Sequence, residues 1–482
     1  MRKINILKDE TAQVLVIFAL LTTILILFTG LAIDSGILYV TKAKLSAAVD
    51  GACLAGMKNL RLGQPTATQV ATDIFNANYG ANPPTPSISF PIDQYDNQYV
   101  QVSATVYVHT LFMQIVPAFA IVPVSDSATS TKNKLIMTIV LDRSGSMGSP
   151  GNPNCGNDCD GGMAALQVAV PAFVANFDST DGAPIGDQVG LVSFSSDSSI
   201  DVPVEYHFQS DIDNAVAAMQ ADGGTFGTGV GTGQLLSQTQ GPPLTMAGNM
   251  NNAAVVNQGQ NVIKVVVYLT DGLMNTIQDN FYCHGKSNQQ LTLLNYGGFD
   301  ASEGTNAVAP QDYTQPANVF YPVYDPDSNG CNGWFQGQCS NQYFGYDSKG
   351  HPCKDNNGNY VTTFPSQQYG KQVQLSRQNV TQEAQWRALQ TSAGLELLSQ
   401  THPNFVYTIG LGQDVNPSTQ KFLANLANDP NPQWGGYNQN QTQGEFFYIT
   451  PQQCPGTGNS CAEAVKAVFQ TIAAKILLRL TQ

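Results

Sequence analysis

Residues 134–147 read KLIMTIVLDRSGSM, an apolar run that ends in one carboxylate and then two hydroxyls at alternate positions. The run at residues 135–141 is short and uninterrupted, as in a strand that is buried on both faces of a sheet. Similar runs follow at residues 189–194, 262–269 and 405–411. The sequence therefore predicts a sheet that is covered by helices on both sides.

Amphipathic segments separate these apolar runs. Apolar residues recur with helical period at residues 163–177, 211–221, 382–399 and 417–428. Strands linked by helical crossovers predict a doubly wound, mostly parallel, Rossmann-like α/β sheet. A last helix at residues 462–480 has an apolar stripe that three basic residues interrupt, so we expect it to pack on the sheet and not in a membrane.

The composition limits the class of protein. A chain of 482 residues is long enough for two or three folded units. Only 12% of the residues are charged, about half of the usual ~25%, and Asn, Gln, Ser, Thr and Gly replace the missing charge. The net charge of -14 and the lack of a basic patch argue against a nucleic-acid partner, because phosphate binding relies on clustered Lys and Arg.

The N-terminal region contains a membrane-anchor signal. Residues 12–33, AQVLVIFALLTTILILFTGLAI, carry no charge and have about the twenty-residue length that a spanning helix needs. Arg2, Lys3 and Lys8 precede them, which predicts a single-pass protein with its N-terminus in the cytoplasm and most of the chain outside. A cleaved secretory signal is the alternative, but its apolar core is usually only about 7–15 residues long. We therefore expect residues 1–33 to be a cytoplasmic stub and an uncleaved anchor.

The nine cysteines agree with an extracytoplasmic location. Cys53 lies in a helical segment, and the other eight lie in polar, loop-like sequence. An even set in such loops predicts disulfides in an oxidising compartment. Zinc is the alternative because Cys155 and Cys159 have near-ligand spacing, although the sequence has no CxxC pair.

Residues 34–131 are predicted to form a small α+β neck. The anchor helix continues to about residue 56, a second helix covers residues 66–78, and residues 99–108 alternate with the period of a half-buried strand. Small residues on the first helix allow either the close approach of another protein or packing within the neck. The α/β domain then occupies residues 132–482.

Residues 275–380 fit neither the helix nor the strand period. They are rich in Asn, Gln, Tyr, Gly and Pro and are too long for a plain loop, so we expect a disulfide-rich inserted subdomain. Residues 325–330, DPDSNG, resemble the start of an EF-hand calcium loop, but the twelfth position is Gln336 in place of a bidentate Glu. A plain Asp/Asn/Gly turn is the alternative.

The end of the opening stretch is a candidate cation site. Ligands of open parallel sheets bind beyond the carboxyl ends of the strands, where Asp142 is expected to emerge. Ser144 and Ser146 add two hydroxyls from the following turn. Three hard oxygens suit a divalent cation such as Mg²⁺. Turn and helix-cap roles are the alternative, because Asp and Ser also favour those positions.

Two further segments contain the additional oxygens that such a site needs. Residues 223–229 read GGTFGTG, and residues 268–272 read YLTDG at the end of another core strand. Together, DxSxS, GGT and LTDG resemble the metal ion-dependent adhesion site (MIDAS) of the von Willebrand factor type A family. The resemblance implies that an ion is lined by Asp142, Ser144, Ser146 and Thr225, with Asp271 holding it directly or through water.

The resemblance also implies the ion and the kind of partner. The cofactor would be Mg²⁺, with Mn²⁺ and Ca²⁺ as alternatives, and an acidic group of a protein partner would complete the coordination shell. Thr228 is an alternative for the threonine ligand, but Thr225 directly follows the glycine pair as the motif requires.

The two ends of the chain indicate a narrower family. Residues 30–56, GLAIDSGILYVTKAKLSAAVDGACLAG, and 106–130, VYVHTLFMQIVPAFAIVPVSDSATS, resemble the N-terminal segment and neck of TadG-like proteins of the bacterial tight-adherence (Tad) pilus machinery. A type A domain that ends in ILLRLTQ completes the likeness. No glycine precedes the apolar run as prepilin processing requires, so the chain departs from pilins proper.

We therefore expect a membrane-anchored, metal-dependent adhesion or scaffold protein of Tad pilus assembly, located at the bacterial cell membrane and binding pilus machinery or a surface ligand. A metal-independent scaffold or minor pilus component is the alternative. A metal-dependent hydrolase is less favoured, because residues 227–233, GTGVGTG, are not followed by the Gly-Lys-Ser/Thr of a phosphate loop and no GxSxG surrounds Ser144. The protein is thus not expected to be an enzyme.

The excursion at residues 149–159 follows Ser146 closely, and the insertion at residues 275–380 begins soon after Asp271. Both leave from the carboxyl ends of strands. We expect both to stand over the cation and to form a rim that selects or covers the acidic partner.

Overall fold

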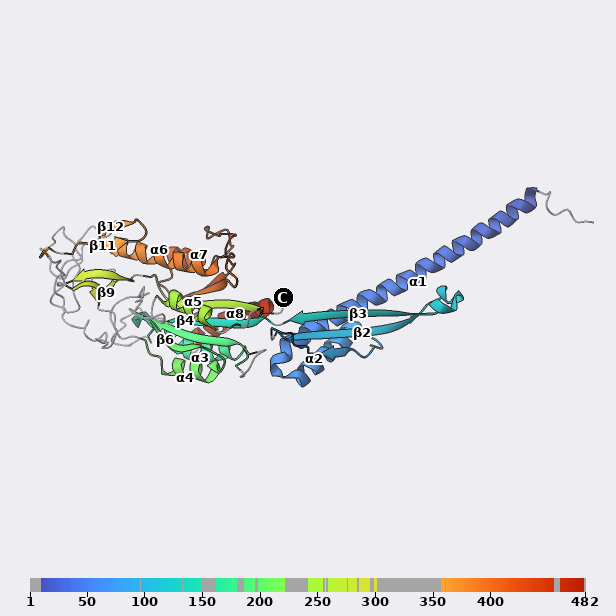
Figure 1. The fold of residues 1–482 in the computed structure, drawn as a ribbon, viewed down its shortest axis with the longest axis horizontal. Coiled ribbons are helices and arrows are strands. Elements are labelled where there is room, and N and C mark those ends of the chain that lie inside the picture. Colours follow the sequence, from blue (N-terminus) through green and yellow to red (C-terminus); the bar gives the residue numbers. More distant parts are fainter. Residues whose placement is uncertain are drawn as a thin grey trace, which may run out of the picture. The chain divides into compact units, whose positions relative to one another are not determined.

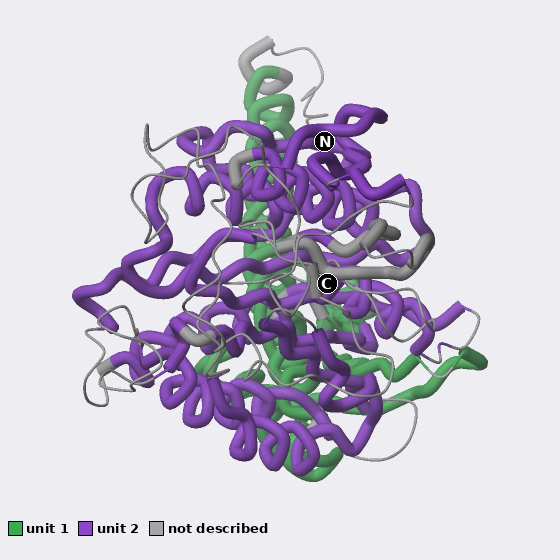
Figure 2. The backbone as a smooth tube through the Cα atoms, turned by 90° about the vertical axis from the view of Figure 1, so that its left-hand side faces the viewer, with its two compact units in different colours: residues 1–132, 481–482 green, residues 133–480 purple. Residues whose placement is uncertain are grey.

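The structure is a computed structural model. It describes residues 10–95, 97–131, 133–148, 161–179, 186–195, 198–221, 242–254, 256, 259–274, 276–283, 286–294, 299–300, 357–359, 361–375, 377–454 and 460–480. The chain forms two compact units, Met1–Lys132 with Thr481–Gln482 (unit 1) and Asn133–Leu480 (unit 2), which Figure 2 shows in different colours.

Unit 1 consists of two helices and an antiparallel sheet. Its elements are α1 (Glu10–Asn59), α2 (Gln64–Tyr79), β1 (Ser87–Ser89), β2 (Tyr99–His109) and β3 (Ile121–Thr131), and β2 is the central strand. Along β2, alternate residues are buried, as the period of two in the sequence predicts.

The helix α1 has two different surfaces. Its first part is covered with exposed apolar side chains such as Leu25, whereas side chains such as Leu45 and Val49 are fully buried in the second part. Among the described residues, α1 is the one helix long and apolar enough to cross a membrane. The small residues serve packing within the unit: a Cβ at Gly56 would lie 3.2 Å from Val100 and 3.3 Å from Ala71.

Unit 2 is built on a six-stranded sheet in the order β14-β13-β7-β4-β5-β6. Only β6 runs antiparallel to its neighbour. The doubly wound, mostly parallel α/β architecture predicted from the sequence is confirmed. The strands are β4 (Lys134–Asp142), β5 (Gln188–Phe194), β6 (Ser198–Glu205), β7 (Val262–Thr270), β13 (Asn404–Leu411) and β14 (Glu445–Ile449).

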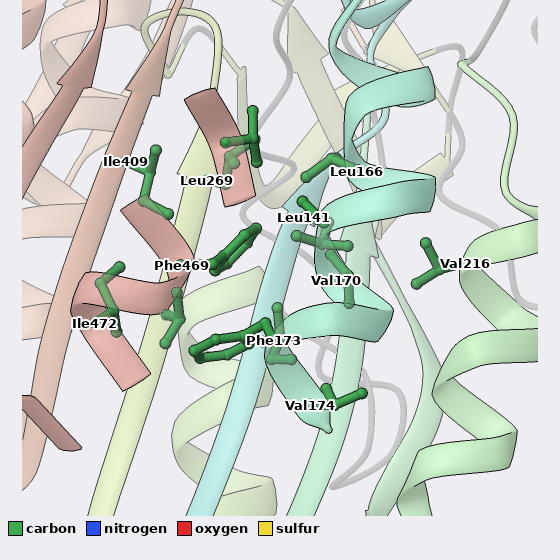
Figure 3. Packing of buried hydrophobic residues seen from close by; sticks show 14 of the residues in the cluster. Leu141, Leu166, Val170, Phe173, Val174, Val216, Leu269, Ile409, Phe469 and Ile472 are labelled. Carbon is green, nitrogen blue, oxygen red and sulfur yellow. The ribbon is translucent and has the colours of Figure 1, made fainter. Parts of the chain in front are cut away.

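Helices cover both faces of this sheet, and alternate residues of each buried strand enter two separate cores. On one face, Leu141, Leu269 and Ile409 pack against α3 (Gly162–Val174), α4 (Phe208–Ala218) and α8 (Ser460–Leu480) (Figure 3). On the other face, Val140 and Tyr268 pack with side chains of α5 (Pro243–Ala253), α6 (Arg377–Glu396) and α7 (Pro417–Leu426).

Two edge strands were not anticipated. The sequence of β6 is SSIDVPVE, in which a proline and two acidic residues interrupt the apolar pattern, and its residues are mostly half-buried. Such a strand is tolerated at the edge of a sheet because one side of its backbone has no neighbour to pair with. The short β14 lies at the opposite edge.

The described part of the insertion forms small antiparallel sheets. They are β8 (Thr276–Cys283), β9 (Lys286–Leu294) and β10 (Phe299–Asp300), and β11 (Thr363–Ser366) with β12 (Lys371–Gln374). Ile277 and Phe364 are fully buried in the core on the α5–α7 side. Most of the insertion's predicted disulfide framework and residues 325–330 lie outside the described residues. Elsewhere, Cys454 and Cys461 form a disulfide, and Cys53 is a buried free thiol.

A buried polar network ties α5 to the sheet. Asn251 accepts a hydrogen bond from Thr138 Oγ1 at 2.8 Å, and its Nδ2 donates to the carbonyl of Val265 at 2.9 Å and to Asn404 Oδ1 at 2.8 Å. The side chain is fully buried. One amide group therefore connects α5 to β4, β7 and β13.

We expect Asn251→Ala to lower the free energy of unfolding of unit 2 by about 2–4 kcal/mol, because buried polar groups on three strands lose their hydrogen bonds to the Asn251 amide. Asn249 on the same helix is exposed, so Asn249→Ala should cost only about 0.5 kcal/mol or less. Urea unfolding of both variants, followed by tryptophan fluorescence, measures the difference. Equal stabilities would show that the network contributes nothing.

Candidate metal site at the carboxyl edge of the sheet

Neighbouring parallel strands bring the first two acidic residues together. Leu141 of β4 pairs with Leu269 of β7, so Asp142 and Thr270 follow at the same level where both strands end, and Asp271 comes next. Asp142 and Asp271 are fully buried. Parallel pairing thus places two carboxylates at the carboxyl edge from segments far apart in the sequence.

The carboxylate of Asp142 is held by hydrogen bonds to both oxygens. The backbone N–H of Ser144 donates to Oδ1 at 2.8 Å, and the hydroxyl of Thr270 donates to Oδ2 at 2.6 Å. Thr270 Oγ1 in turn accepts from the N–H of Gly272 at 3.2 Å. These contacts fix the orientation of Asp142 before any ligand is bound.

The two serine hydroxyls also converge. A tight turn at Gly145–Met147, with Met147 N–H donating to the carbonyl of Ser144 at 3.0 Å, curls the chain back. Ser144 Oγ and Ser146 Oγ lie 3.1 Å apart. Octahedral Mg²⁺ with bonds of about 2.1 Å requires adjacent ligand oxygens about 3 Å apart, so this spacing fits two neighbouring coordination positions.

The electrostatics of the site favour a bound cation. Burial raises the pKa of Asp142, while hydrogen bonds from Thr270 and Ser144 and from the backbone of Asp271 counteract that rise. Ionised carboxylates are costly to bury unless a positive charge compensates them. Among the described residues, no group of three or more His, Cys, Asp or Glu side chains could hold a metal, so an ion here also needs the hydroxyls.

The structure thus brings together Asp142, Ser144, Ser146 and Asp271. Thr225 and its alternative Thr228 lie outside the described residues, as does the excursion at residues 149–159. Thr270 was not anticipated as a functional residue. The sequence feature that could have indicated it is its position directly before Asp271 at the end of a buried strand. There its hydroxyl donates to the carboxylate of the neighbouring strand.

A polar cleft beside the site was also missed. It is lined in part by Arg143, Ser193, Ser199 and Asp201. Burial raises the pKa of Asp201, whereas hydrogen bonds from the two serines and the charge of Arg143 lower it. Arg143 directly follows Asp142 in the motif, and this position was the only sequence signal of the cleft.

Two family descriptions match the chain. Residues 12–59 match "Putative Flp pilus-assembly TadE/G-like", and residues 137–273 match "von Willebrand factor type A domain". The second match runs from β4 to just beyond Asp271 and so contains the whole candidate site. No curated protein matches the chain.

Several solved structures are loosely similar. The vWF domain of the type V pili tip protein Mfa5 from Porphyromonas gingivalis is 16% identical, with 72% of this chain and 97% of that chain covered and a TM-score of 0.34. The pilus adhesin SpaC from Lactobacillus rhamnosus GG is 15% identical, with 82% of this chain and 35% of that chain covered and a TM-score of 0.33. The adhesive tip pilin GBS104 from Group B Streptococcus agalactiae is 11% identical, with 80% of this chain and 68% of that chain covered and a TM-score of 0.34.

The two family matches occur in the order that the sequence predicts, with the pilus-assembly segment on the apolar helix α1 and the second match on the α/β unit that holds the candidate site. The chain thus contains a segment that matches the TadE/G-like pilus-assembly family, followed by a domain that matches the von Willebrand factor type A family.

Proposed function

We propose that unit 2 is a metal-dependent adhesion domain that binds an acidic group of a protein partner through a divalent cation at the carboxyl edge of its sheet. The observation that carries this proposal is the meeting of Asp142, Ser144 and Ser146 in a ligand-like geometry, beside a second buried carboxylate at Asp271. Mg²⁺ suits these hard oxygens best, with Mn²⁺ or Ca²⁺ as alternatives.

The residues of the site supply neutral and charged oxygens for the cation. Ser144 and Ser146 supply neutral oxygens, Asp142 and Asp271 supply negative charge, and Thr225 supplies a further hydroxyl. The two carboxylates balance the charge of a divalent cation, and because the other ligands are neutral hydroxyls the cation can still accept a carboxylate from outside the chain. The groups at the site hold and orient oxygens through mutual hydrogen bonds, which suits binding more than proton transfer.

The N-terminal region supplies the context of this activity. A membrane-anchored protein with a TadE/G-like segment is expected at the pilus machinery, and partners are pilus components or surface ligands. The basic residues before the apolar run put the N-terminus in the cytoplasm and unit 2 outside the bacterial membrane.

The described strands of the insertion support a role in partner selection. Its first strand, β8, begins at Thr276, only a few residues after Asp271. Figure 1 shows β9, β11 and β12 together at one end of unit 2, beyond the large sheet. This position supports the proposal that the insertion forms part of a rim around the cation and selects the acidic partner.

A pull-down from the native cell envelope tests the proposed function. Detergent-solubilised full-length protein should capture its partner in Mg²⁺ and lose it in EDTA. Removing the positive charge leaves the partner's acidic group without its counter-charge, which costs about 2–5 kcal/mol and weakens binding at least about 30-fold. Capture that is equal with and without chelator would contradict the proposal and favour the metal-independent scaffold.

A further inference from the structure

The turn between β2 and β3 has an unusual surface for a loop. Residues 110–120, called here the hairpin tip, read TLFMQIVPAFA, and no charged residue occurs between His109 and Asp126. Its large apolar side chains are exposed: Leu111 57%, Phe112 39%, Ile115 71%, Val116 50% and Phe119 50%. Contiguous exposed apolar surface of this kind marks a contact with another apolar phase.

One carboxylate ties the hairpin tip to α1. Asp34 accepts hydrogen bonds from the backbone N–H groups of Leu111 at 2.8 Å, Phe112 at 2.9 Å and Met113 at 2.6 Å. Its side chain is 1% exposed. Asp34 is also the first charged residue after the apolar run of α1, so the tip is attached where that run ends.

A second contact lies deeper along the helix. A Cβ at Gly30 would lie 2.5 Å from Phe112 Cγ, so Phe112 packs directly on the backbone of α1 within the apolar run. A rise of 1.5 Å per residue puts Gly30 about 6 Å nearer the membrane centre than Asp34. Interfacial elements typically bury their apolar face about 5–10 Å into the headgroup and acyl boundary, which matches this depth.

The polar part of the hairpin begins farther from the membrane. Lys42 forms an ion pair with Asp126 at 2.9 Å and donates to the carbonyl of Ser125 at 2.7 Å. Lys42 is about 12 Å along α1 from Asp34. Between these levels, Tyr39 and Tyr107 are exposed, as expected for aromatic residues at a membrane interface. The two attachment points together fix the hairpin along the helix.

The backbone of the hairpin tip is suited to a medium with little water. Besides the three N–H groups bound by Asp34, those of Thr110, Ile115, Val116, Phe119 and Ala120 donate to carbonyl oxygens within the tip. Thr110 Oγ1 also donates to the carbonyl of Phe119 at 2.8 Å. These hydrogen bonds lower the cost of placing the tip in the interfacial layer of a bilayer, where unsatisfied backbone groups are costly.

We propose that the hairpin tip is a second membrane-contacting element, which enters the outer part of the bilayer that α1 crosses and is held at that depth by Asp34. Its occupant is lipid and not another protein chain, because the exposed apolar side chains continue the lipid-facing surface of α1 at one level and the charged residues begin above it. The tip would thereby set the height and tilt at which the neck stands on the membrane.

Photo-crosslinking of the full-length protein in native membranes tests this proposal. A benzophenone amino acid is placed singly at Ile115 or Phe119, at Leu25 as a positive control, and at Tyr95 as a negative control. Leu25 is 68% exposed on α1, and Tyr95 is 40% exposed near the other end of β2. The side chains at all four positions are exposed on the surface of the protein, so the replacements should not disturb the core.

We expect lipid adducts at Ile115 and Phe119 at yields near that of Leu25 and at least about tenfold above that of Tyr95, which lies on the order of 30 Å from the tip along β2. Adducts to protein in place of lipid would overturn the proposal and indicate that another chain covers the tip. Absence of adducts at both tip positions, while Leu25 reacts with lipid, would overturn it equally.

Discussion

We expect Asp142→Asn to remove measurable Mg²⁺ binding to the full-length protein while unit 2 remains folded. The substitution keeps the shape of the side chain but removes one of the two negative charges brought to the carboxyl edge. Loss of an outer-sphere partner alone typically weakens metal binding about 10–100-fold, so loss of a charged ligand should weaken it by at least about 100-fold.

The fold should survive because two effects oppose each other. The substituted amide keeps one acceptor oxygen but presents an NH2 donor in place of the other, so it can accept only one of the hydrogen bonds from Ser144 N–H and Thr270 Oγ1, which costs about 1–3 kcal/mol. It would also relieve the burial of an ionised carboxylate, which already raises the pKa of Asp142. We expect the metal-free variant to stay within about 2 kcal/mol of the parent protein.

Thermal unfolding at increasing Mg²⁺ concentration measures both expectations. At 100 times Kd, bound ion stabilises the parent protein by about 2.7 kcal/mol, and the variant should show no such rise. Asp187→Asn is the matched control. Asp187 is also buried, but it accepts hydrogen bonds from Asp178 N–H and Leu135 N–H at the start of β4, the opposite edge of the sheet. A variant at Asp142 that still responds to Mg²⁺ as the parent does would refute the site.

We expect Gly444→Ala to destabilise unit 2 by more than about 4 kcal/mol, the range in which single substitutions are exceptional. Gly444 directly precedes β14 and is clamped between β13 and the end of α7. Its N–H donates to the carbonyl of Ala427 at 3.0 Å, and a Cβ would overlap the carbonyl oxygen of Val406 and approach that of Ala427 to 2.6 Å. Both obstacles are backbone atoms, so no side chain can move aside to make room.

Tryptophan fluorescence is a suitable measurement, because all three tryptophans lie in unit 2 and Trp434 packs edge-on against Phe446 of β14. We expect the Tm of unit 2 to fall by about 5 °C or more. The control is Gly394→Ala, at a helical position of α6 where a Cβ meets nothing within 4 Å. That variant should gain about 0.5–1 kcal/mol from the lower conformational entropy of its unfolded chain. Similar effects of the two alanines would contradict the steric argument.

The parallel core strands of unit 2 could be predicted because their pattern is local. Uninterrupted apolar runs such as that of β4 indicate burial on both faces, and an acidic residue directly after such a run must emerge at the carboxyl edge of the sheet. Both Asp142 and Asp271 follow this rule. The edge strand β6 could not be predicted in this way, because an exposed edge tolerates the proline and the acidic residues that break its apolar pattern.

The sequence by itself determined the anchor helix, the α/β class and the candidate cation ligands, because each depends on the order of side chains within a few residues. Only the tertiary structure decided that Thr270 holds Asp142 and that Asp34 holds the N–H groups of the hairpin tip. In both cases the donor and the carboxylate are far apart in the chain. A hydrogen bond depends on where atoms meet in space, and no local periodicity encodes which distant backbone a carboxylate will reach.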